Sequence, residues 1–361
     1  MPELAIIVPY VNEMPQLVFT LRGIAEELRG EDFEIVAVDN WCRFLEENDK
    51  GVPVRVPDKG HDRLIDATDK NRIYGLNLGG PPGVRVHRAV SHIEAMAKKH
   101  SWLRHVRYED KLSHWNAKNV GVANSINAKY YWFMDAHTML SKGAVKAFHF
   151  YKKNWRELQG TLHLPWTYHI LESQRLIYKM VVDDLAGVYH YSTLNLPPKI
   201  PSDPFEVPVM TTCGMMMHRE YFHLLGGWPK ALGIYGGGEN FVNYVSAILG
   251  LKKWVYPDAT IYHMGEKRGY NWYYDNYQLN RMIALYMIGG LDLVWRFLEK
   301  SVKGHHRILR KEMMELAQNP HLQMQRKTIM QNQQVCLSEW VAKWIESGKF
   351  VSGTSVQSYN G

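Results

Sequence analysis

Residues 4–40, LAIIVPYVNEMPQLVFTLRGIAEELRGEDFEIVAVDN, decide the fold of this 361-residue chain. The apolar run Ala5 to Val8 ends at Pro9, as a strand buried on both faces would. Apolar positions at helical spacing follow between Met14 and Leu28, and a second apolar run covers Phe33 to Val38. Strand, helix and strand in this order predict a βαβ unit with parallel strands and a right-handed crossover.

The alternation of strand and helix signals continues to about residue 290. A helix is expected over Asn116 to Ala128, and the apolar strand Tyr130 to Met134 follows it. A proline-rich linker occupies 197–208. The strand and helix signals beyond it cover Val209 to Met217, Glu239 to Leu249 and Lys253 to Tyr256. The remaining residues are helical in pattern and strongly charged. The sequence therefore predicts an α/β fold, a mixed sheet flanked by helices, with a C-terminal helical extension.

The composition is that of a folded protein with a large core, because 46% of the residues are hydrophobic and 22% are charged. No apolar run reaches the ~18 residues of a membrane-spanning helix, and no secretory signal is visible. Three scattered cysteines predict no disulfide framework, which favours a reducing, cytoplasmic location. The net charge of +7 suits a polyanionic partner, but charge alone does not distinguish a nucleotide-sugar from DNA, RNA or an acidic membrane.

The strongest chemical signal is the stretch Trp132-Phe133-Met134-Asp135-Ala136-His137, where an apolar strand ends at an acidic residue. Side chains two positions apart on an extended chain project to the same side, so Asp135 and His137 can share one divalent cation. A carboxylate oxygen and an imidazole nitrogen suit Mn²⁺ among other ions. An isolated Asp-x-His is more often an ordinary strand end, so a metal site needs a further ligand.

His263 offers that further ligand. It leaves the strand-like segment Ala259 to Tyr262 and is followed in the chain by Lys267 and Arg268. If His263 completed the metal site, the two cations would lie near a diphosphate and neutralise charge on the leaving group. A single histidine at this position would be interpreted as a structural residue, and only its combination with Asp-x-His favours a functional role.

A glycine-rich turn, Gly236-Gly237-Gly238-Glu239-Asn240, opens a predicted helix. Glycines allow the backbone to approach a ligand closely, and a helix N-terminus favours anionic groups. Glu239 in a pocket can accept sugar hydroxyls or act as a general base toward an acceptor hydroxyl. The alternative interpretation is a helix start at which the glutamate is stabilised by the helix dipole.

These motifs together resemble a known family. Asp135-Ala136-His137 after an apolar strand resembles the Asp-x-His metal motif of the polypeptide N-acetylgalactosaminyltransferases. The stretch from Cys213 to Trp228 is similar to their next segment, and Tyr235 to Asn240 resembles their Trp-Gly-Gly-Glu-Asn. His263 followed by Arg268 resembles their final metal-binding histidine and basic loop.

The N-terminus resembles a wider group. Val8-Pro9-Tyr10-x-Asn12-Glu13, with the strand that ends in Asp39, is similar to the donor-binding start of family 2 glycosyltransferases. The order and spacing of the motifs match over about residues 4–275. The resemblance implies the GT-A (Rossmann-like) fold. It also implies a GT-A catalytic domain at 1–290, with a nucleotide-sugar half at about 1–140 and an acceptor half at about 205–290. A basic helical extension would follow at 291–361.

The resemblance implies a role for each matching residue. Asp135, His137 and His263 would bind the metal, with Mn²⁺ favoured and Mg²⁺ as the alternative. The residues that would contact a nucleotide-sugar donor, with a UDP-sugar favoured, are Pro9, Tyr10, Glu13, Asp39, Lys118, Asn119, Asp135 and Arg268. Glu239 and Asn240 would be the catalytic residues that meet the transferred sugar or the acceptor. Cys213 departs from the family, which has small glycines at this position.

The choice of acceptor depends on further features of the sequence. The secretory anchor and lectin domain of the animal family are not seen, so protein O-glycosylation in a secretory lumen does not transfer. Basic GT-A enzymes without an anchor include transferases that glycosylate hydroxymethylated pyrimidines in phage and kinetoplastid DNA, and the N-terminus is similar to the group associated with base-oxidising dioxygenases. Cations of the tail can contact the phosphates of double-stranded DNA. The aromatic residues Trp272, Tyr273, Tyr274 and Tyr277 can stack a displaced base, or form a core stripe.

We therefore predict a glycosyltransferase that acts on a hydroxymethylated pyrimidine in DNA, in the host cytoplasm if the protein is viral. One alternative is a transferase acting on a glycan, a lipid-linked sugar or a protein. Another is a non-catalytic binding module derived from the GT-A fold. The sequence does not decide the donor sugar, the stereochemistry of transfer or the oligomeric state.

Overall fold

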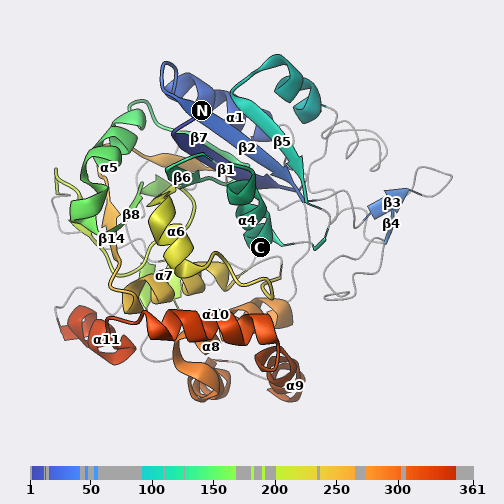
Figure 1. The fold of residues 1–361 in the computed structure, drawn as a ribbon, viewed down its shortest axis with the longest axis vertical. Coiled ribbons are helices and arrows are strands. Elements are labelled where there is room, and N and C mark those ends of the chain that lie inside the picture. Colours follow the sequence, from blue (N-terminus) through green and yellow to red (C-terminus); the bar gives the residue numbers. More distant parts are fainter. Residues whose placement is uncertain are drawn as a thin grey trace.

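The computed structural model describes the larger part of the chain up to residue 346. The described ranges are 2–11, 13, 16–40, 45–47, 53–55, 92–108, 110–111, 113–125, 127–167, 180–182, 189–191, 201–233, 236–264, 274–301 and 306–346. Within them a central sheet has helices on both faces, and the C-terminal helices lie side by side along one end (Figure 1).

The central sheet has eight strands in the order β12-β14-β8-β13-β6-β1-β2-β5. The strands are β1 (Leu4–Tyr10), β2 (Phe33–Asp39), β5 (Leu103–Arg107), β6 (Tyr130–Phe133), β8 (Gly160–His163), β12 (Phe205–Glu206), β13 (Met215–His218) and β14 (Lys252–Val255). β6, β1, β2 and β5 are parallel, and β8 and β14 are parallel to each other. β13 is antiparallel to both of its neighbours, which makes the sheet mixed.

Helices cover both faces of this sheet. α1 (Gln16–Glu27), a helix at 92–99 and α5 (Val145–Leu158) lie on one face, and α4 (His114–Asn124), α6 (Arg219–Leu225) and α7 (Gly238–Ile248) lie on the other. Successive side chains of β1 enter opposite layers: Ile6 and Val8 pack with the α1 side, and Ala5 and Ile7 pack with the α4 side. A strand that is buried on both faces has no polar alternation, which explains the unbroken apolar run at the start of the chain.

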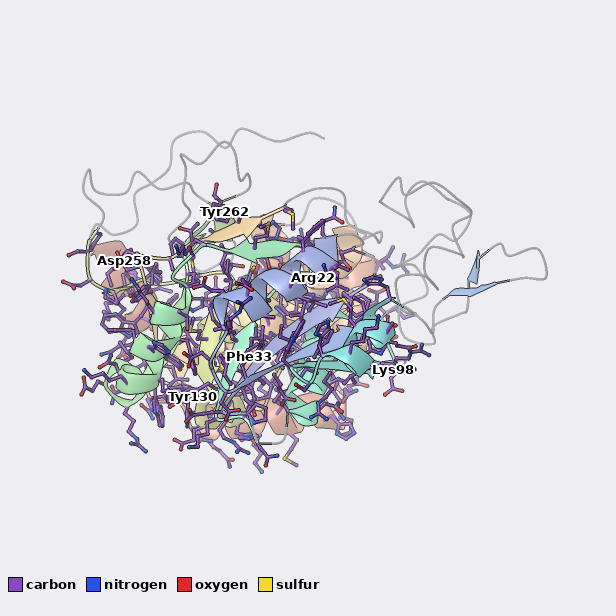
Figure 2. The ribbon with its side chains drawn as sticks, turned by 90° about the horizontal axis from the view of Figure 1, so that it is seen from above. Arg22, Phe33, Lys98, Tyr130, Asp258 and Tyr262 are labelled. Atoms are coloured by element: carbon purple, nitrogen blue, oxygen red, sulfur yellow. The ribbon has the colours of Figure 1, made fainter. Side chains whose placement is uncertain are left out.

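A second, three-stranded sheet lies at the carboxyl end of β6. It consists of β7 (Thr138–Leu140), β15 (Ile261–His263) and β9 (Trp166–Thr167), in that order. Figure 2 shows Tyr262 of β15 in the upper part of the view, above Phe33 and Tyr130, the first residues of β2 and β6. This small sheet therefore covers the edge where ligands of open α/β sheets bind. Two further pairs of strands are β3 (Leu45–Glu47) with β4 (Pro53–Arg55) and β10 (Met180–Val182) with β11 (Tyr189–Tyr191).

Four helices form the C-terminal part of the described chain: α8 (Tyr274–Ser301), α9 (His306–Ala317), α10 (Pro320–Gln331) and α11 (Leu337–Glu346). Gly290, with φ of 66°, kinks α8 at the residue after which the extension was expected to begin. Leu309 and Leu322 join the same hydrophobic core as α7, and Trp340 of α11 meets Tyr244 of α7 edge-on with ring centroids 5.9 Å apart. The domain limits stay a prediction. None of the helices built from the described residues combines the length and apolar character that crossing a lipid bilayer requires.

The predicted α/β class, with its mixed sheet, flanking helices and helical C-terminal part, is confirmed. One predicted boundary is wrong: the strand expected to begin at Val209 begins at Met215. Residues 207–214 are irregular backbone instead. The described part of the expected linker contains β12, whose Phe205 pairs with Val255 of β14. Neither the helices α5 and α6 nor the strands β5 and β8 were predicted. The stretch 48–82, which is rich in glycine and proline, falls almost wholly outside the described residues.

Candidate functional site

Asp135 lies where the parallel part of the sheet ends. The backbone N–H of Met134 donates to the carbonyl oxygen of Ile7 at 3.0 Å, so β6 follows β1 up to that point and the chain then leaves the sheet. The residues before Asp135 are buried, whereas its own side chain is 20% exposed. The strand therefore carries a carboxylate to the ligand-binding edge, as predicted.

The turn after Asp135 is held by two threonines. The Thr20 hydroxyl shares its one proton between the carbonyl oxygens of Ala136, at 3.0 Å, and Thr138, at 2.7 Å, and accepts from the N–H of Thr138 at 3.0 Å. The Thr138 hydroxyl donates to the carbonyl oxygen of Asp135 at 2.7 Å. Because these contacts fix the backbone from residue 135 to residue 138, the direction of the Asp135 and His137 side chains is fixed as well.

The three-stranded sheet brings His263 to this turn. β15 pairs antiparallel with β7 so that His263 is opposite Thr138, and the N–H of Met264 donates to the carbonyl oxygen of His137 at 2.9 Å. More than a hundred residues of chain separate the two histidines, yet the strand pairing places them side by side. This register is the structural reason that the two motifs meet.

Asp135, His137 and His263 form a compact group, the Asp135 triad, whose ligand atoms all lie within 4.8 Å of one another. His137 Nε2 is 3.2 Å from His263 Nε2, and His263 Nε2 is 3.5 Å from Asp135 Oδ2. The two imidazoles are nearly perpendicular, at 87°. Ligands at about 2.1 Å from one ion and at right angles to each other are separated by about 3.0 Å, which is close to these distances.

The electrostatics of the Asp135 triad keep the carboxylate ionised. Burial acts to raise the pKa of Asp135, but the adjacent His263 imidazole and then the Lys118 ammonium outweigh it and hold that pKa well below its usual range. Asp135 Oδ1 is buried and accepts no hydrogen bond within the part of the chain that the structure describes. An ionised carboxylate with a buried oxygen that lacks a donor, facing two imidazole nitrogens, fits a divalent cation.

A third imidazole lies beside Asp135 and was not predicted. His114, the first residue of α4, places Nε2 3.6 Å from Asp135 Oδ1, on the other oxygen from the one that faces His263. Its side chain is 21% exposed and its ring meets that of Trp115 edge-on. Nothing in the local sequence around His114 marks it, because its position depends on how α4 docks against β6.

Lys118 lies behind the carboxylates. Its side chain is fully buried, and its ammonium donates to the Thr212 hydroxyl at 3.0 Å. The rings of Trp115 and Trp228 lie 5.0 Å and 5.6 Å from the Lys118 nitrogen. Burial lowers the pKa of Lys118, and the charges of Asp135, then Cys213 and Glu239, oppose this shift. Contact between Lys118 and the nucleotide-sugar stays a prediction. The effect of its charge on the carboxylates of Asp135 and Glu239 follows from its position.

Glu239 lies in the first turn of α7 and faces the same region. Its Oε1 accepts from the Thr211 hydroxyl at 2.7 Å and from the N–H of Thr212 at 3.3 Å. Burial raises the pKa of Glu239, and the hydrogen bond from Thr211 offsets part of this rise. A carboxyl group with a raised pKa is suited to accept a proton near neutral pH. Neither threonine was predicted, because their role depends on the contact with α7.

The glycine-rich turn before Glu239 is a close-packed joint. Gly237 has φ of 70°, and a Cβ on it would lie 2.2 Å from the carbonyl oxygen of Asn280. A Cβ on Gly238 would lie 2.1 Å from the Trp115 ring. The turn can therefore pass between α8 and α4 only without side chains. Asn240, the other predicted catalytic residue, is 2% exposed in α7, and its part in catalysis stays a prediction.

The predicted donor-binding residues of the N-terminal half come together at the ends of β1, β2 and β5. Pro9 and Tyr10 are buried, and Tyr10 is opposite Asp39 in the β1–β2 register. The Tyr10 hydroxyl is 2.9 Å from His105 Nε2, and that nitrogen is 4.0 Å from an Asp39 oxygen. Asp39 is 1% exposed, so the structure places it in the wall of this region. Glu13 Oε2 accepts from the N–H of Val11 at 2.7 Å.

Asn119 has a structural use in addition to its predicted donor contact. Its amide donates to the carbonyl oxygen of Trp228 at 2.8 Å and accepts from the N–H of Trp228 at 3.0 Å. The next glycine of α4, Gly121, packs against Ile7, where a Cβ would lie 2.4 Å from the Ile7 side chain. Arg268, Lys267, Trp272 and Tyr273 lie outside the described residues, so the expected basic loop and aromatic cluster stay predictions.

No protein-family model matches the sequence, and no curated protein sequence matches it. Among solved structures, the fold is similar to that of GalNAc-T7, whose crystal structure contains UDP, GalNAc and Mn²⁺. The TM-score is 0.63 at 14% identity, and the match covers 97% of this chain and 57% of that chain. The chain thus spans little more than half the length of that enzyme.

Two structures of S. aureus TarS match less well. One gives a TM-score of 0.47 at 12% identity, over 92% of this chain and 54% of that chain. The other, of TarS residues 1–349, gives 0.45 at 10% identity, over 99% and 95%. These scores are too low to support an argument about this chain. The likeness to GalNAc-T7 shows the fold: the chain is an α/β protein with the GT-A architecture.

Proposed function

We propose that this protein is a glycosyltransferase that moves a sugar from a UDP-sugar to an acceptor hydroxyl with the help of a divalent cation. The observation that carries the proposal is the meeting of Asp135, His137 and His263 at the carboxyl edge of a GT-A sheet. Glu239 lies close to this group, and its charge, like that of Asp135, acts on Lys118. The structural neighbour GalNAc-T7, determined with UDP, GalNAc and Mn²⁺, supports the choice of donor and of Mn²⁺ over Mg²⁺.

The chain's own groups divide the work. Asp135, His137 and His263 would hold the cation, which supplies positive charge against the diphosphate leaving group when it is bound. His263, and after it Lys118, would keep the pKa of Asp135 low and its carboxylate ionised. Glu239, held by Thr211, would accept the proton of the acceptor hydroxyl or orient a hydroxyl of the transferred sugar. Pro9, Tyr10, Glu13 and Asp39 would form the nucleotide end of the site.

For the acceptor we propose a hydroxymethylated pyrimidine of double-stranded DNA. The support is the net charge of +7 and the exposed cations of the C-terminal helices, among them Arg296, Lys300, Arg307, Arg310, Lys311, Lys327 and Lys343. A glycan, a lipid-linked sugar or a protein is the alternative acceptor. The location in a reducing cytoplasm stays a prediction from cysteine usage.

One experiment tests donor and acceptor together. The protein is incubated with a panel of sugar nucleotides and either hydroxymethylcytosine DNA or unmodified DNA, with Mn²⁺ or with excess chelator, and products are analysed by mass spectrometry. We expect one hexose or N-acetylhexosamine mass added to the modified DNA, only with a UDP-sugar and Mn²⁺. Donor hydrolysis without DNA product would retain the transferase and reject this acceptor. Full activity in chelator, or no turnover of any donor, would reject the proposed function.

A further inference from the structure

A line of buried hydrogen bonds runs from β8 to Glu239. The Thr161 hydroxyl is 2.7 Å from His163 Nε2, and His163 Nδ1 is 2.9 Å from the carbonyl oxygen of Thr211. The Thr211 hydroxyl then donates to Glu239 Oε1 at 2.7 Å. Thr161 and His163 are each 1% exposed and Thr211 is 5% exposed, so water does not compete for these contacts.

The chemistry of the partners fixes the tautomer of His163. A carbonyl oxygen only accepts, so Nδ1 carries the proton and donates to Thr211, and Nε2 accepts from the Thr161 hydroxyl. Burial lowers the pKa of His163 to about 3, so the imidazole stays neutral at physiological pH. His163 therefore acts as a fixed donor toward one backbone carbonyl and has no charge to exchange with the site.

That carbonyl belongs to the irregular segment 207–214, which crosses the sheet before β13 begins. Asn243 of α7 holds the preceding residue, Met210, by donating to its carbonyl oxygen at 2.8 Å and accepting from its N–H at 3.0 Å. His163 holds Thr211 from the sheet side. Asn243 and His163 therefore hold two adjacent residues of the segment, Met210 and Thr211, by hydrogen bonds. These contacts fix the backbone from which the Thr211 hydroxyl reaches Glu239.

We propose that His163 is a positioning residue for transfer: through Thr211 it fixes the direction in which the Glu239 carboxylate faces the reacting groups. The inference rests on the proposed catalytic role of Glu239. Losing the His163 contact would let Thr211 turn, leave a buried carbonyl without a donor, and free the carboxylate to adopt other rotamers. Small misplacements of a catalytic group cost much in turnover and little in binding.

The test compares His163→Leu with His163→Asn. Leucine fills the space without a donor, whereas the asparagine amide can donate to the Thr211 carbonyl. We expect kcat to fall about tenfold in His163→Leu and to return to within about threefold of wild type in His163→Asn, with the donor KM and the Mn²⁺ affinity unchanged. His218→Leu is the matched control, because His218 is also a buried histidine, 5% exposed and stacked on Trp155. It lies at the end of β13 away from Met215, the residue that pairs with His163. His218→Leu should lose thermal stability and keep kcat.

A double-mutant cycle separates positioning from general damage. Once Glu239→Gln has removed the group that His163 positions, adding His163→Leu should lower kcat no further. Full additivity, an unchanged kcat in His163→Leu, or an equal loss in His218→Leu would each overturn the inference. If His163→Leu does not fold, the cycle is run with Thr211→Val, which removes the hydroxyl through which His163 would act on Glu239. An unchanged kcat in Thr211→Val would then overturn the inference.

The activity of the wild-type protein separates a failure of the proposed function from a failure of the role assigned to His163. If it turns over no UDP-sugar, the proposed function fails and the role of His163 in transfer fails with it. If it is active and His163→Leu has wild-type kcat, only the inference about His163 fails.

Discussion

The Asp135 triad and the surroundings of Glu239 are built in different ways. The triad takes its side chains from the ends of strands, and pairing of β15 with β7 brings its parts together at a partly exposed edge. Glu239 instead sits on a helix against an irregular segment, and its partners Thr211 and Thr212 are buried. The first arrangement suits a ligand that enters from solvent. The surroundings of Glu239 suit a group whose direction must be held. Lys118 acts on the carboxylates of both regions.

The largest effect is expected at the triad. Asp135→Ala should reduce transfer about a thousandfold, because it removes the only carboxylate among the three ligand groups and leaves two imidazoles with a weaker hold on a hard cation. Initial rates and Mn²⁺ affinity are to be measured together, and both should fall. Asp258→Ala, an exposed aspartate, is the control and should match wild type. A Mn²⁺-dependent rate that survives Asp135→Ala would remove the triad from the account.

Glu239→Gln should separate the two regions. We expect kcat to fall about a hundredfold, because the amide cannot accept a proton, while the donor KM and the Mn²⁺ affinity stay within about twofold. The measurement is steady-state kinetics at saturating acceptor, with metal titration alongside. Equal losses in kcat and in donor affinity would show that Glu239 is a structural cap of α7 and not a catalytic group.

Lys118→Met should affect both regions, but less strongly. Methionine is similar in length, can pack beside the Trp115 and Trp228 rings, and removes the charge that helps to keep Asp135 ionised. We expect about a tenfold loss in Mn²⁺ affinity and in kcat, in the range found for residues that support metal ligands. Lys98→Met is the control, since Figure 2 shows Lys98 at the periphery of the molecule, on the helix at 92–99. Unchanged metal affinity in Lys118→Met would restrict the lysine to packing.

The smallest effect concerns stability and pH. The pKa of Glu239 is higher in the folded protein than in the unfolded chain, so between these two values the folded state binds the proton more tightly. Stability from this group is therefore present at low pH and is lost as pH rises through the folded pKa. Glu239→Gln does not titrate, so its Tm relative to wild type should increase by about 1–3 °C from pH 4 to pH 7, measured without metal. A difference that is flat or falls with pH would contradict the assigned burial cost.

The same contrast explains what could be predicted from the sequence. Asp135 and His137 are two residues apart at the end of an apolar strand, so their shared direction is a local property that the sequence displays. His263 could be proposed as the further ligand from the residue pattern and the family resemblance, but its meeting with them depends on the register of β15 with β7, which is not a local property of the sequence. The strand order, with β13 reversed, is likewise a property of long-range pairing.

The buried partners of Glu239 could not be predicted for a related reason. His163 lies on β8, which is only four residues long, and Thr211 lies in a segment that was expected to be a strand. Their hydrogen bonds join three elements that are far apart in the chain. Asn119 shows the opposite case, since the resemblance indicated a donor contact and the fold uses both ends of its amide to hold Trp228.

Pulsed EPR of the protein loaded with one equivalent of Mn²⁺, in the presence of UDP, tests the central claim most directly. If Asp135, His137 and His263 hold one cation, the spectrum should contain couplings from two imidazole nitrogens. One coupling should disappear in His137→Ala and the other in His263→Ala. A spectrum of hydrated Mn²⁺, or two nitrogen couplings that persist in both variants, would contradict the account.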